Sequence, residues 1–126
     1  MAKIKIAQNP TFKAFVLIPI VGSEPEKIEF TFRYRDREEL ASLFDEWNVK
    51  RGEMRGSLGE NPTLSQIVAA DTEQQAQQIK DLVCAWAFDD KFDDKSIRAF
   101  VKSCQGATEA VVDAYQGAFS QARLGN

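Results

Sequence analysis

The chain has 126 residues, of which 44% are hydrophobic and 28% are charged, so length and composition predict a single globular domain spanning residues 1–126. It contains no histidine, which excludes Ser-His and Cys-His nucleophilic pairs and zinc sites built from imidazole. The net charge of −3 argues against nucleic acid as a partner, because proteins that bind phosphates usually carry a basic surplus. We expect a protein that is not an enzyme, needs no cofactor or metal, and acts by binding.

The same sequence favours a cytoplasmic protein without a membrane segment. Its longest apolar run, residues 14–21, contains Pro19 and is far shorter than the roughly 20 residues that span a bilayer. The N-terminal sequence lacks the core and cleavage site of a signal peptide. Cys84 and Cys104 fall within helical apolar patterns, so we expect core thiols in a reducing compartment.

The N-terminal third predicts a β-hairpin. Residues 12–21 are rich in β-branched and aromatic side chains, residues 22–26 supply a turn, and residues 28–35 alternate strictly between apolar and polar. The apolar set of the second strand is expected to face the core: Ile28, Phe30, Phe32 and Tyr34. Residues 3–6 are a candidate for a third short strand, and Pro19 should lie at an edge or strand end.

Helices are predicted to follow. Asp36 and Glu39 resemble a capping box for a helix over 37–49, whose apolar stripe is Leu40, Leu43, Phe44 and Trp47. The three glycines of residues 50–61 indicate a loop. A short helix is expected over 62–70, and a longer one from Asp71 or Thr72 to near Phe88, with Ile79, Leu82, Val83 and Trp86 inside.

The last quarter repeats this pattern. Asp93 should cap a helix, with Phe92 and Ile97 as its hydrophobic staple, and Gly106 should end it. A final helix is expected over 107–122. The fold class is therefore α+β: an N-terminal β-hairpin, possibly of three strands, over 11–35, packed on a body of four to five helices over 36–122.

The acidic cluster Asp89, Asp90, Asp93 and Asp94 admits two interpretations. Paired carboxylates can hold Mg²⁺ or Ca²⁺ or perform acid–base chemistry, which keeps a carboxylate-based metal enzyme as a hypothesis. The calcium-loop spacing is absent, however, and Lys91 and Lys95 interrupt the cluster, so a helix-capping turn is favoured. Phe88 and Phe92 flank this turn and are our candidate contacts for a partner, because aromatic side chains dominate binding hot spots.

Three segments in order carry a family resemblance: FTFRYRDREEL (30–40), CAWAFDDKFDDKSIRAFV (84–101) and GATEAVVDAYQGAFSQARLGN (106–126). Together they resemble the tail assembly chaperones of long-tailed phages and prophages. The positions that fall on the family pattern are Trp86, Phe92, Ile97, Ala114, Tyr115, Ala122, Arg123 and Asn126. One departure is residues 103–106, where the family would have a Tyr-Pro-Gly-like turn.

The resemblance implies a non-catalytic protein that binds the phage tape-measure protein, and possibly the tail-tube protein, during tail assembly. It also implies that a longer product made by frameshifting can exist. The alternative is a phage structural or adaptor protein, for example one joining head to tail, that is retained in the virion. The sequence leaves the oligomeric state and the binding surface open.

Overall fold

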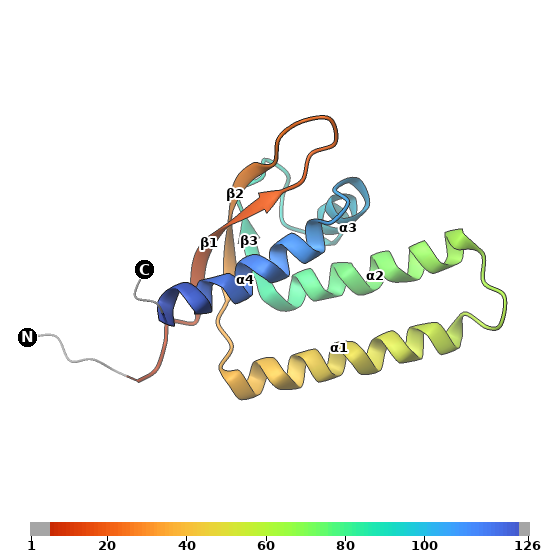
Figure 1. Cartoon of the computed structure of the whole chain (residues 1–126), viewed down its shortest axis with the longest axis horizontal. Coiled ribbons are helices and arrows are strands. Elements are labelled where there is room, and N and C mark those ends of the chain that lie inside the picture. Colours follow the sequence, from red (N-terminus) through yellow and green to blue (C-terminus); the bar gives the residue numbers. More distant parts are fainter. Residues whose placement is uncertain (1–5, 124–126) are drawn as a thin grey trace, which may run out of the picture.

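A computed structural model describes residues 6–123 of the chain. Its elements are β1 (Thr11–Ile18), β2 (Glu26–Arg33), α1 (Arg37–Ser57), α2 (Leu64–Leu82), β3 (Val83–Trp86), α3 (Asp94–Ser103) and α4 (Ala107–Arg123). The strands form one antiparallel sheet in the order β1-β2-β3. α2 and α4 contact the sheet, whereas α1 lies apart from it beside α2 (Figure 1). The predicted α+β class is confirmed.

The hairpin forms as predicted, but its first strand ends three residues earlier than expected and its second begins and ends two residues earlier. β1 and β2 pair from Thr11 opposite Arg33 to Ile18 opposite Glu26. β1 ends immediately before Pro19, as expected of a residue without a backbone N–H. The alternation of β2 is also confirmed, because Phe30 and Phe32 are completely buried.

The third strand is formed by residues that we predicted to be helical. α2 stops at Leu82, and Val83 already has extended φ and ψ angles of −113° and 140°. Residues 83–86 include the strand formers Val83 and Trp86 and pair with the free side of β2, so this pairing overrides the helical spacing. Cys84 is therefore in a strand. Of the third strand expected at 3–6, only Ile6 is described and it lies outside any strand; the rest lies outside the described residues.

The loop predicted over 50–61 begins only at residue 58, and the predicted break near residue 71 is wrong. α1 continues through Gly52 and Gly56 to Ser57, because the good helix formers around these glycines outweigh a cost of about 1 kcal/mol for each. α2 is continuous from its capping box at Thr63 and Gln66. Thr72 caps nothing: its hydroxyl donates to the Val68 carbonyl one turn back at 2.8 Å.

The last two helices begin and end near the predicted residues. The Asp93 side chain caps α3, and Gly106, with φ of 83°, separates α3 from α4 in the left-handed conformation that glycine adopts at no steric cost. α4 packs against the sheet through Tyr115, whose hydroxyl donates to the Arg33 carbonyl at 2.9 Å. The predicted stripes of both helices face the core, which contains Ile97, Phe100, Val111 and Tyr115.

Two long helices project beyond this core. Residues 48–75, which we call the arm, comprise the C-terminal half of α1, the 58–63 connection and the N-terminal part of α2 as far as residue 75. Figure 1 shows both helices running away from the sheet to the connection at their far end. No side chain of the arm is fully buried. α1 is held near its middle by Trp47, whose indole N–H donates to the Asp81 carboxylate at 2.8 Å.

Candidate functional site

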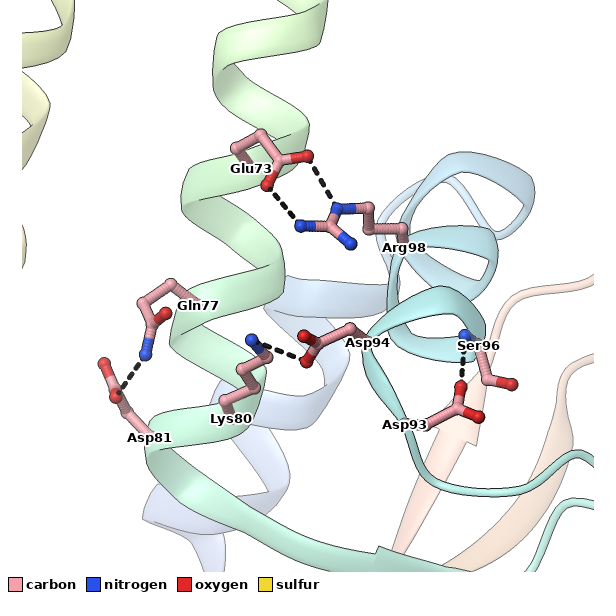
Figure 2. Close-up of polar contacts among 8 residues, drawn as sticks. All are labelled: Glu73, Gln77, Lys80, Asp81, Asp93, Asp94, Ser96 and Arg98. Atoms are coloured by element: carbon pink, nitrogen blue, oxygen red, sulfur yellow. Dashed lines mark hydrogen bonds and ion pairs between the residues drawn. The ribbon is translucent and has the colours of Figure 1, made fainter.

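The acidic turn is organised as a helix start. The Asp93 carboxylate accepts from the Ser96 N–H at 2.9 Å, and this hydrogen bond holds the pKa of Asp93 below its ordinary value. The next carboxylate, Asp94, pairs with Lys80 of α2 at 2.6 Å, and this contact lowers the pKa of Asp94 (Figure 2). Both carboxylates are thus ionised at neutral pH and engaged in structure.

A second ion pair joins α2 to α3 one turn further along α3 and two turns toward the start of α2. The Arg98 guanidinium donates to both carboxylate oxygens of Glu73, at 2.7 and 3.1 Å, in a bidentate arrangement (Figure 2). The hydrogen bond between Arg98 and Glu73 lowers the pKa of Glu73 and raises the pKa of Arg98. We call these two pairs, Glu73–Arg98 and Lys80–Asp94, the polar seam.

The acidic residues do not converge on a common point. Within residues 6–123, no three His, Cys, Asp or Glu side chains lie close enough together to hold a metal ion. Asp93 and Asp94 are drawn to different partners, and Asp89 and Asp90 are exposed. The arrangement serves helix capping and helix–helix attachment.

The two aromatic residues proposed as partner contacts lie in an aromatic cluster that also contains Trp86. The ring of Phe92 meets that of Trp86 edge to face at 4.9 Å, and the ring of Phe88 does so at 5.1 Å. The cluster continues to the buried rings of Phe30 and Phe100. Phe88 and Phe92 are half-buried, so part of each ring remains accessible.

The other positions of the family pattern are spread over the fold. Ile97 and Tyr115 are in the core, and Ala114 is half-buried on α4. Arg123 is the last residue of α4, and Asn126 lies outside the described residues. These positions are not brought together into one site.

The arm carries the exposed apolar surface on the helices. Leu64, Ile67 and Val68 follow one another at i, i+3 and i+4 on α2, with exposed fractions of 74%, 41% and 53%. Beside them, a groove of about 520 Å³ opens between α2 and α3. It is lined by Leu64, Ser65, Val68, Ala69, Thr72, Glu73, Arg98 and Lys102.

The groove has an apolar floor and charge at one end. Leu64, Val68 and Ala69 form the apolar part, while the Glu73–Arg98 pair and Lys102 lie toward α3. An apolar core with a polar rim is the usual anatomy of a protein–protein contact. Chemically, this site can bind another apolar surface, and its charged end can orient the bound chain.

Sequence reasoning missed this site, although a signal was present. The apolar positions of α2 continue N-terminally from the buried Ala76 and Ile79 through Val68 to Leu64. Placing a helix break near residue 71 concealed that continuity. If α2 had been predicted as one long helix, the helix that follows it would have been too short to cover its apolar positions, and an exposed apolar face would have been expected.

Comparison with known protein families identifies the family of the chain. Residues 1–126, the whole chain, match the family described as phage tail assembly chaperone. The chain belongs to the phage tail assembly chaperone family. Searches of curated proteins and of solved structures found no match.

Membership confirms the resemblance despite the departure at residues 103–106. The family name implies protein partners in tail assembly, and α2 carries exposed apolar side chains. Within the described part of the chain, no helix combines the length and the apolarity that crossing a membrane requires.

Proposed function

We propose that this tail assembly chaperone binds the phage tape-measure protein in the host cytoplasm and acts without catalysis, with the tail-tube protein as a second partner. The observation that carries the proposal is the exposed apolar face of the arm, formed by Leu64, Ile67 and Val68. Adjacent apolar side chains that a folded chain leaves uncovered mark an interaction surface.

The shape of this face suits a helical segment of the partner. An amphipathic helix places its apolar side chains at i, i+3, i+4 and i+7, and the exposed residues of α2 occupy the first three of these positions. Fully burying a Leu, Ile or Val side chain contributes about 1.5–3 kcal/mol, and binding would bury the part of these three side chains that is still exposed, so together they contribute a fraction of the full amount. Covering apolar surface on the partner in this way would also keep the partner soluble.

The polar chemistry of the molecule supports a non-catalytic role. The acidic side chains with shifted pKa values, Glu73, Asp93 and Asp94, are engaged in a helix cap and in ion pairs between helices. The sheet and all four helices contribute to one hydrophobic core, which supports a single domain over 1–126.

Co-expression with the tape-measure protein of the same phage tests the proposal. The soluble fraction of that protein should rise, and Val68→Asp should abolish the rise because it places a charge in the apolar face. Val21→Asp is the matched control: it makes the same substitution at a residue that is 91% exposed in the hairpin turn. Failure of the unmodified chaperone to bind or to solubilise the tape-measure protein would contradict the proposal.

Two further measurements separate the alternatives. Mass spectrometry of purified phage particles should find no trace of the chain, whereas a head–tail adaptor would be retained. Phe88 and Phe92 stay proposed secondary contacts. Alanine substitution of either should lower the melting temperature, because both rings pack on Trp86, and should also weaken binding of the tape-measure protein at a temperature where the variant is still folded. Unchanged binding by the folded variants would assign the two residues to the aromatic cluster alone.

A further inference from the structure

β1 is an edge strand whose outer side is unpaired. The Tyr34 N–H donates to the Pro10 carbonyl at 2.9 Å, so the backbone groups of residue 10 face those of residue 34. Because this direction alternates along a strand, Phe12, Ala14, Val16 and Ile18 direct their backbone groups toward β2.

The odd-numbered residues of β1 have the opposite orientation. Thr11, Lys13, Phe15 and Leu17 direct their N–H and C=O groups toward the free edge, and no hydrogen bond from residues 6–123 reaches them. They present a row of donors and acceptors roughly 20 Å long. Such an edge is a template for one more strand.

The space beside this edge has room for a further strand. A groove of about 800 Å³ lies between β1 and α4. Phe12 of β1 and Phe119 of α4 line it, and the other α4 residues along it are small: Ala114, Gly117 and Ala118. A Cβ atom added at Gly117 would have no neighbour within 4 Å, so the helix leaves this space open. An edge strand beside a helix with small residues can hold an extended chain.

Side chains around the groove define the chemistry of that chain. Phe15 and Leu17 are 56% and 59% exposed and offer apolar contacts at alternate positions. The charged residues that line the groove are both lysines, Lys13 and Lys27. Lys27 lies over the Phe15 ring at 5.4 Å, and Lys13 has only a 4.0 Å contact with Glu29. The complementary occupant has alternating apolar side chains and a carboxylate.

We propose that the free edge of β1 binds an extended segment of a partner protein, with apolar side chains at alternate positions and an acidic residue, as an added strand between β1 and α4. This surface is distinct from the apolar face of α2, so the chaperone holds a helix at one site and a strand at the other. The inference rests on the proposed function only for the source of the partner segments.

Short fluorescent peptides that overlap along the tape-measure and tail-tube proteins of the same phage test this inference by fluorescence anisotropy. At least one peptide of the stated pattern should bind. Lys13→Ala should weaken it modestly through loss of charge, and Lys13→Pro about tenfold further, because proline removes an N–H that faces only the free edge. Gly117→Leu should abolish binding by filling the groove, while Gly117→Ala retains it.

Several results would overturn the proposal. These are the absence of any binding peptide, equal affinities for Lys13→Pro and Lys13→Ala, or unchanged affinity in Gly117→Leu. Protection of the amides of residues 11, 13, 15 and 17 from hydrogen exchange in the free protein would also do so, because the edge would then already be covered. If the peptides fail while co-expression still solubilises the tape-measure protein, the strand site is wrong and the proposed function stands.

Discussion

The sheet-side body and the arm of this chaperone are stabilised in different ways. In the body, aromatic rings interlock with centroid separations of 4.9–6.1 Å, and Phe30 alone contacts Phe32, Trp86, Phe88 and Phe100. In the arm, no side chain is fully buried, and local features hold the helices: capping residues, an i,i+4 ion pair and hydrogen bonds within a turn.

Because of this difference, the residues that stabilise the fold and the residues available for binding lie in different regions. Helices without tertiary packing are marginal, so the arm depends on its attachment through Trp47 and the polar seam. It can therefore display apolar residues such as Leu64 and Val68, whose substitution has little influence on the core. A binding surface on the arm can change with the partner while the fold is preserved.

The largest difference between the two regions should come from truncating one apolar side chain in each. Phe30→Ala should lower the free energy of unfolding by about 3–5 kcal/mol, because it empties the centre of the aromatic cluster. Leu64→Ala should change it by less than about 0.5 kcal/mol. Urea unfolding measures both, and a comparable loss from Leu64→Ala would show that the arm has a core of its own.

A hydroxyl-to-carbonyl hydrogen bond occurs in both regions and gives the next comparison. Tyr115→Phe keeps the ring but removes the 2.9 Å bond to the Arg33 carbonyl in the core, at a cost of about 1–3 kcal/mol. Burial raises the pKa of Tyr115, so the hydroxyl stays protonated and donates at neutral pH. Ser57→Ala removes the exposed 2.7 Å bond to Met54 and should cost less than about 0.5 kcal/mol. Equal losses in thermal unfolding would contradict the distinction.

Glycine substitutions should have opposite signs in the two regions. Gly52→Ala should stabilise α1 by up to about 1 kcal/mol, because a Cβ atom there meets nothing within 4 Å and alanine is the better helix former. Gly106→Ala should destabilise by about 1–2 kcal/mol, because φ of 83° is unfavourable for a side chain. Calorimetric unfolding of the two variants checks the signs. Destabilisation by Gly52→Ala would show that α1 is strained at this position.

Sequence reasoning succeeded where a local rule agreed with the tertiary structure. Asp36, Asp93 and Gly106 mark helix ends by their own backbone and side-chain chemistry, and the alternation of β2 fixes its buried face. It failed where two rules competed. The segment 83–86 satisfies a helical stripe as well as a strand, and only the vacant edge of β2 decides between them.

The binding surfaces were less accessible from sequence, for a physical reason. Leu64, Ile67 and Val68 have the spacing of a core stripe, and exposure depends on α3 being too short to cover them. The free edge of β1 likewise follows from the position of β3 on the other side of β2. An uncovered surface is a property of the assembled fold rather than of any one segment.

The smallest effect should appear at the junction of arm and body, and it should depend on pH. The pKa values of Glu73 and Asp94 are lowered in the folded protein by Arg98 and Lys80, so the unfolded chain binds protons more readily. The seam therefore stabilises above the ordinary values of 4.5 and 3.8, and this contribution is lost as pH falls through and below them. Glu73→Gln, which breaks the ion pair between the arm and α3, should flatten the acid dependence of the urea midpoint. Glu53→Gln, an exposed carboxylate of the arm in no ion pair among the described residues, should leave it unchanged. Equal slopes for both variants would show that the Glu73–Arg98 pair does not couple the arm to the body.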